Sequence, residues 1–208
     1  MELKRKIGAH VIVLLVRDDL GPMAEDLLDT LEKLDAKGPA LREGTRIAYG
    51  WTTLTLAEGY ESEPSLDIRE PDLDSEDPLQ ITLAGADETL DVILQQGSVC
   101  KLVDVEAVAS WYMHDVRLAP GVLDEDAVYL HRQRPTSDHD TGWYIGSVAN
   151  QNGVRPEDVE TMPVWQVFQR RRALLQVMAL PIEYLAIVKY TYVDAILDPS
   201  NKEIYRRR

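Results

Sequence analysis

Short runs of β-branched and aromatic residues recur along this chain, and only a few segments between them have helical periodicity. The run His10–Arg17 is apolar and predicts a buried strand. The next segment, Met23–Lys37, repeats leucine at the spacing of one helix face and predicts an amphipathic helix that ends at Gly38. A chain that alternates in this way is expected to combine a sheet with packed helices.

The remaining segments follow the same pattern. Val128–Arg134 and Gly142–Val148 are expected to form a hairpin around a polar turn. Further strands are expected at Arg46–Leu56, Ser65–Arg69, Leu79–Leu83 and Glu183–Leu197. Helical segments are expected at Asp87–Gln96, after Asp104 within Cys100–Tyr112, at Arg155–Val159 as a single turn, and at Val164–Met178. The predicted class is α+β, with a mixed, largely antiparallel sheet and helices packed on it.

The length of 208 residues predicts a single α+β domain over 1–208. An alternative is a subdivision near residue 120, into an N-terminal part over 1–120 and a second part over 121–208. The lone cysteine, Cys100, has no partner for an internal disulfide or a paired-cysteine zinc site. No signal peptide or membrane span is indicated, so the cytoplasm is the expected compartment.

Charge is the compositional feature that bears most on function. The formal net charge is −14, and nine carboxylates lie between Glu58 and Asp77 with Arg69 as the single base. Such a field disfavours nucleic acid and anionic membranes and favours a basic protein partner. A solvated loop is the alternative interpretation of the acidic stretch. The residues expected to contact a partner are Glu61, Glu63, Asp67, Glu70, Asp72 and Asp74.

Motifs for catalysis are sparse. The chain has no G-x-S-x-G elbow and no glycine-rich phosphate loop, so neither an enzyme nor a cofactor is expected. Asp138, His139 and Asp140 form the one cluster that suggests a metal-assisted hydrolase. Alternation along a strand would point His139 away from the two aspartates, and Asp and His are common turn residues. No metal site is therefore predicted.

The segment Tyr129–Gly146 contains a strand with Arg132, a polar turn, and then Asp140-Thr141-Gly142-Trp143. This arrangement resembles the Asp-Ser/Thr-Gly-Trp motif of the immunity protein 33-like family of bacterial polymorphic-toxin systems. Thr141 stands where that family usually has serine, and the acidic stretch that often follows is absent here.

The resemblance implies a cytoplasmic inhibitor that binds a toxin or effector without chemistry. Independently of it, Asp140 is suited to accept backbone N–H groups, Gly142 to adopt a turn conformation, and Trp143 to anchor a strand in the core. The alternatives are the hydrolase and a structural or assembly protein of a secretion-linked operon. The sequence indicates no oligomeric state.

Overall fold

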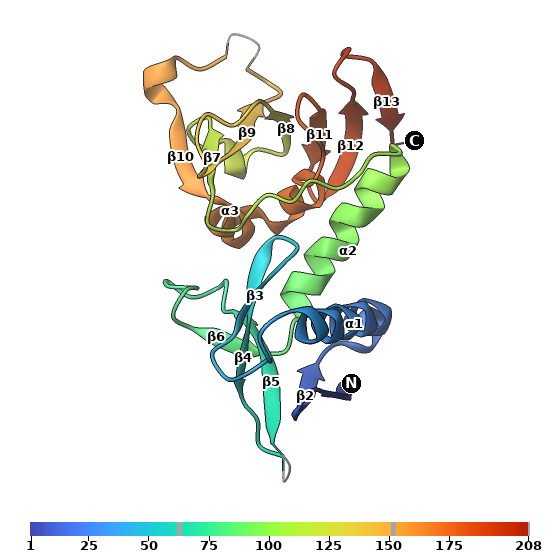
Figure 1. The fold of residues 1–208 in the computed structure, drawn as a ribbon. Helices are drawn as coiled ribbons and strands as arrows, with labels where there is room; N and C mark the ends of the chain where they lie inside the picture. The colour runs from blue at the N-terminus through green and yellow to red at the C-terminus, as the bar shows by residue number, and fades with distance from the viewer. Residues whose placement is uncertain (62–63, 151–152, 208) are drawn as a thin grey trace. The chain divides into compact units, whose positions relative to one another are not determined.

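The computed structural model describes residues 1–61, 64–150 and 153–207. The chain forms two compact units, an N-terminal unit over Met1–Leu94 and a C-terminal unit over Gln95–Arg208 (Figure 1). The units divide between Leu94 and Gln95, and each has its own sheet. Both sheets are mixed and mostly antiparallel, which confirms the predicted α+β class.

The sheet of the N-terminal unit has the order β1-β2-β5-β4-β3, and β6 also pairs with β5. β2 and β5 are parallel, while the other pairs are antiparallel. The strands are β1 (Glu2–Ile7), β2 (His10–Leu15), β3 (Arg46–Tyr49), β4 (Thr52–Glu58), β5 (Ser65–Pro71) and β6 (Thr82–Ala84). The acidic stretch therefore contributes a strand to the interior of this sheet.

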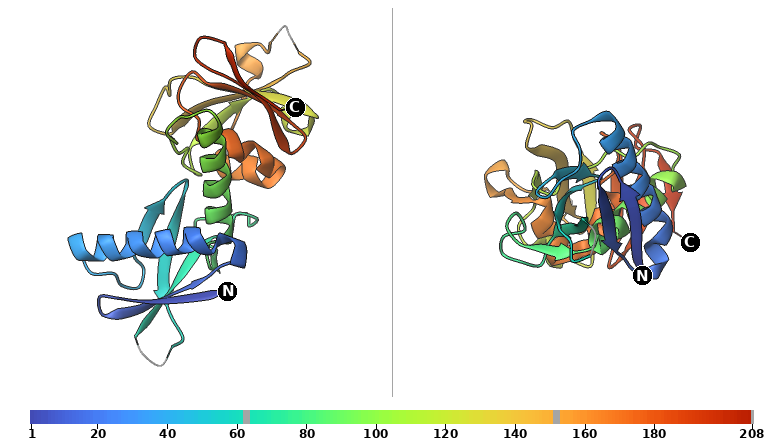
Figure 2. Two further views of the ribbon diagram at one scale, coloured as in Figure 1. Left: turned by 90° about the vertical axis from the view of Figure 1, so that its right-hand side faces the viewer. Right: turned by 60° about the horizontal axis from the view of Figure 1, so that its bottom comes forward.

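Helix α1 (Gly21–Lys37) follows the short 3-10 helix η1 (Asp18–Leu20) and lies on one face of that sheet (Figure 2). Its buried leucines pack with Ile12 and Leu14 of β2 and with Leu54 of β4. The predicted leucine stripe is thus the core face of the helix, except that Leu34 is exposed.

The sheet of the C-terminal unit has the order β10-β7-β9-β8-β11-β12-β13. β7 and β9 are parallel, while the other neighbours are antiparallel, and the predicted hairpin is β8 with β9. The strands are β7 (Asp115–Leu118), β8 (Ala127–Arg132), β9 (Asp140–Ser147), β10 (Glu160–Pro163), β11 (Leu185–Lys189), β12 (Tyr192–Leu197) and β13 (Glu203–Arg206).

The remaining helices are α2 (Asp87–Leu102), α3 (Val164–Arg171) and the 3-10 helices η2 (Val122–Asp124), η3 (Pro156–Asp158) and η4 (Arg172–Val177). Residues of α2 up to Leu94 belong to the N-terminal unit, and those from Gln95 belong to the C-terminal unit. Over the described parts of the chain, no helix has the length and apolar character needed to cross a membrane.

Two predictions around α2 are wrong. The helix continues through Gly97, because Val99 and Cys100 are buried and Gln96 donates a hydrogen bond to the Leu175 carbonyl at 3.0 Å. This packing outweighs the cost of about 1 kcal/mol for a glycine inside a helix. The helix expected after Asp104 does not form, since Asp104 has a left-handed φ of 54° and the Val108 N–H bonds to Ala179.

Other boundaries also differ from the sequence pattern. Arg46–Leu56 and Glu183–Leu197 were each expected to be one strand, but each spans parts of two strands joined by a tight turn. The strand expected over Leu79–Leu83 is β6, which begins only at Thr82. The helix expected over Val164–Met178 changes to 3-10 geometry at Arg172. Four short strands had no clear sequence signal: β1, β7, β10 and β13.

Candidate functional site

The turn between β8 and β9 is built around the Asp140 carboxylate. Its Oδ2 accepts hydrogen bonds from the Thr136 N–H and hydroxyl, both at 2.8 Å, and its Oδ1 accepts the Gly142 N–H at 2.7 Å. Burial acts to raise the pKa of Asp140, but these donors stabilise the anion and the net effect is a lowered pKa. Asp140 therefore stays ionised as the centre of the turn.

Gly142 occupies a position that no other residue fits. Its φ is +78°, and a Cβ there would lie 2.1 Å from the backbone oxygen of Gln133. The close approach exists because the Gln133 N–H donates to the Gly142 carbonyl at 2.8 Å. The glycine of the motif thus allows β8 and β9 to meet at the start of the hairpin.

Trp143 is completely buried. Its indole N–H lies 3.0 Å from the Ser110 hydroxyl and 3.1 Å from the Met178 carbonyl. Thr141 supports the same region, because its hydroxyl donates to the Asp115 carbonyl at 2.8 Å and lies 3.2 Å from the Trp143 N–H. Serine would supply the same hydroxyl, which explains how threonine can stand at this position.

Arg132 is 5% exposed and points into the same region. Its Nη1 donates to the carbonyls of Val108 and Leu180, each at 2.7 Å, and its Nε donates to the Thr141 carbonyl at 3.3 Å. Its guanidinium lies 5.6 Å from the Trp143 ring centroid. Burial lowers the pKa of Arg132 to about 10, so it remains charged at neutral pH.

The four motif residues are therefore brought together, and their polar groups bond within the chain. Arg132 and Trp143 join the hairpin to two distant segments, one around Val108 and Ser110 and the other around Met178 and Leu180. This arrangement gives the motif a structural role in the C-terminal unit.

The Asp138-His139-Asp140 cluster does not converge with other ligands. His139 makes an edge contact with His114, at 5.7 Å between ring centroids. The Asp140 carboxylate instead accepts the N–H groups of Thr136 and Gly142 in the turn. Burial lowers the pKa of His114, and the nearby His139 lowers it further. Asp115 and Asp138 act to raise this pKa, but the net effect is a decrease. Within the described ranges, no three His, Cys, Asp or Glu side chains form a group that could hold a metal ion.

Comparison with known families adds to this geometry. The family model of the Imm33-like domain matches residues 95–198, half of the chain. The chain belongs to the Imm33-like domain family. The match confirms the resemblance carried by Tyr129–Gly146 and extends it over nearly all of the C-terminal unit. No curated protein and no solved structure shows significant similarity to the chain.

The charge of this Imm33-like protein is concentrated outside the family match. The N-terminal unit contains 21 acidic and 9 basic residues and has a formal net charge of −12. The C-terminal unit contains 15 acidic and 13 basic residues and has a net charge of −2. An attraction for a basic molecule would therefore act mainly through the N-terminal unit.

The residues expected to contact a partner do not form one surface. Glu70 is 4% exposed, and its carboxylate accepts the N–H groups of Glu88 at 3.1 Å and Thr89 at 2.8 Å in the first turn of α2. Burial raises its pKa in spite of these bonds. Glu70 of β5 therefore caps the start of α2. Because its side chain is buried there, it does not belong to the exposed acidic residues.

Four of the other five residues are described by the structure and lie in two different settings. Asp72 and Asp74 belong to the loop after β5, where the Asp72 carboxylate accepts the Asp74 N–H at 3.2 Å. Glu61 and Asp67 line a hollow on the sheet. Glu63 lies outside the described residues.

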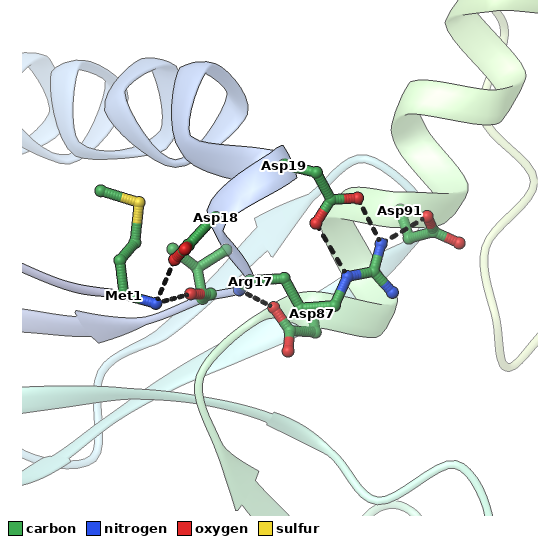
Figure 3. A network of polar contacts seen from close by, with 7 residues as sticks. Met1, Arg17, Asp18, Asp19, Asp87 and Asp91 are labelled. Carbon is green, nitrogen blue, oxygen red and sulfur yellow. Dashed lines mark hydrogen bonds and ion pairs between the residues drawn. The ribbon is translucent and has the colours of Figure 1, made fainter.

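Sequence reasoning missed a charge cluster around Arg17 (Figure 3). Its guanidinium bonds to Asp19 at 3.2 Å and to Asp91 at 2.9 Å, while its backbone N–H donates to Asp87 at 2.7 Å. Beside this cluster, the α-amino group of Met1 forms an ion pair with Asp18 at 2.9 Å. Asp87 and Asp91 are seventy or more positions from Arg17, so no local pattern could have indicated the cluster.

Proposed function

We propose that this chain is an immunity protein that binds and neutralises a basic toxin or effector in the bacterial cytoplasm without catalysing a reaction. The observation that carries the proposal is membership of the Imm33-like domain family. The net charge of −12 on the N-terminal unit supports a basic partner, because electrostatic attraction speeds the encounter of oppositely charged proteins.

The direct test is capture of the partner. The tagged chain is co-expressed with each neighbouring open reading frame of its own genome and purified. We expect one neighbour to co-purify, to be toxic when expressed alone and to be harmless with this chain. If every neighbour is expressed but none is captured or neutralised, the immunity function is wrong.

A second experiment tests the loop after β5 that contains Asp72 and Asp74. Replacing Asp72 and Asp74 by lysine is expected to slow association with the captured partner several-fold at low salt, and the loss should shrink as salt screens the charges. The control changes Glu106 and Glu160 to lysine, because both are exposed residues of the C-terminal unit. Equal slowing by both pairs would contradict a special role for the loop.

The hydrolase alternative, built on Asp138, His139 and Asp140, receives no support from the side-chain geometry. It predicts that a divalent ion raises the melting temperature and that Asp138→Ala removes the effect. The assembly-protein alternative predicts self-association, which light scattering of the purified chain would detect.

A further inference from the structure

The N-terminal sheet has a face that α1 does not cover. Ile12 and Leu14 of β2 point into the core beneath α1, so Val13 and Leu15 point to the opposite side. On that side a hollow of about 270 Å³ is lined by Val13, Leu15 and Ala84 together with several polar residues. Leu15 is 44% exposed there, which leaves apolar surface open to solvent.

Three carboxylates line this hollow: Glu2, Glu61 and Asp67. Lys4 is shared by two of them, because its Nζ lies 2.9 Å from Glu2 and 2.7 Å from Glu61. The third, Asp67, makes no side-chain hydrogen bond or ion pair with the parts of the chain that the structure describes. The hollow therefore has more negative charge than its own lysine neutralises.

Asp67 is affected both by its partial burial and by the charges around it. Burial raises its pKa, Arg69 on the same strand lowers it, and Glu61 and Glu2 raise it again, with a net increase. The Arg69 guanidinium is directed to the Thr82 carbonyl at 3.1 Å. A further positive charge at the hollow would relieve the repulsion among the three carboxylates.

Tyr60 completes the lining and is 93% exposed. We propose that this hollow binds an arginine side chain of the basic partner. The aliphatic stem of an arginine suits the exposed Leu15 and Ala84. Its planar guanidinium suits the Asp67 carboxylate and the face of the Tyr60 ring. That the arginine belongs to a basic protein partner rests on the proposed function. The net negative charge of the N-terminal unit favours such a partner.

The test uses the full chain with methyl-labelled residues and a blocked Gly-Arg-Gly peptide as the probe. In an NMR titration, the methyl signals of Val13, Leu15 and Ala84 are expected to shift and to saturate. The same peptide with citrulline, which has the shape of arginine without its charge, is expected to cause no saturating shift. Unshifted methyl signals, or equal shifts with both peptides, would overturn the proposal.

Variants locate the binding within the hollow. Asp67→Asn is expected to weaken peptide affinity about five-fold, the order expected for one partly exposed ion pair. Tyr60→Ala should also weaken peptide affinity without affecting folding, because the Tyr60 side chain is 93% exposed. Glu76→Gln removes one exposed carboxylate from the same unit outside the hollow and should leave affinity unchanged. Equal loss from Asp67→Asn and Glu76→Gln would show only general attraction and overturn the site.

The two proposals fail separately, because the peptide titration needs no toxin. If the peptide binds in a way that depends on Asp67 but no neighbour is captured, the arginine site is supported and the immunity function is wrong. If a toxin is captured but Asp67→Asn does not change the titration, only the arginine site is wrong.

Discussion

Asp140 and Arg132 act as single residues by bonding to backbone groups of the hairpin and of the segments that pack on it. Asp140 receives three donors within the turn, and Arg132 supplies donors to three carbonyls. A buried polar group without a hydrogen bond costs roughly 1–3 kcal/mol, so each of these side chains affects stability more than its size suggests. The motif is therefore open to tests by conservative substitutions.

Gly142→Ala should be strongly destabilising because it combines a left-handed φ with a steric clash. Gly121 provides a matched control, since its φ is +69° but a Cβ there would meet no atom within 4 Å. We expect Gly121→Ala to cost about 1–2 kcal/mol for the left-handed backbone alone. Gly142→Ala should cost at least about 2 kcal/mol more. Urea denaturation measures both, and similar values would contradict the clash.

Asp140→Asn should reveal the pH dependence of the turn. The native pKa of Asp140 is lowered, so its contribution is fully present above the ordinary value of about 3.9 and is lost as pH falls through the native pKa. At pH 6 the variant should be less stable by about 2 kcal/mol. This difference should shrink below about pH 4. An unchanged difference at pH 3 would contradict the assignment.

At the scale of secondary-structure elements, α2 depends on contacts from outside its own sequence. Its first turn is capped by Glu70 of β5, and the Trp51 indole donates to the Thr89 carbonyl at 3.3 Å. Further along, Gln96 and Cys100 are buried on the C-terminal unit. The contacts of Gln96 and Cys100 explain why the helix continues through Gly97, beyond the end expected at Gln96.

Glu70→Ala should therefore weaken α2 at its start. Loss of the cap leaves the N–H groups of Glu88 and Thr89 without this acceptor, and the expected cost is about 1–2 kcal/mol. Hydrogen exchange should increase first at these two amides. Asp74→Ala, at an exposed position, should change stability by less than about 0.5 kcal/mol. Unchanged exchange in the first turn would refute the capping role.

At the scale of the whole molecule, charge is divided unequally between the two units. The excess of negative charge on the N-terminal unit opposes its compaction, and salt screens that repulsion. Raising NaCl from about 20 to 300 mM, which shortens the Debye length several-fold, should thus stabilise this unit selectively. The expected gain is on the order of 1 kcal/mol. Hydrogen exchange measured separately over 1–94 and 95–208 provides the test, and equal gains in both ranges would contradict it.

Features that depend on local periodicity and turn chemistry could be predicted from the sequence. The leucine spacing placed α1, the alternation around the polar turn placed the β8–β9 hairpin, and Asp140-Thr141-Gly142-Trp143 indicated the family. These signals are readable because a helix repeats every 3.6 residues, a strand alternates every two, and a tight turn restricts its residue types.

The solvent exposure of the acidic stretch and the division into units depend on contacts between segments that are far apart in the sequence. Glu70 and Asp67 belong to one strand, yet Glu70 caps α2 while Asp67 lines the hollow on the other face. Charge and composition do not distinguish these environments, because burial depends on elements far away in the sequence. For the same reason, the course of α2 through Gly97 and the cluster around Arg17 follow from packing between distant segments.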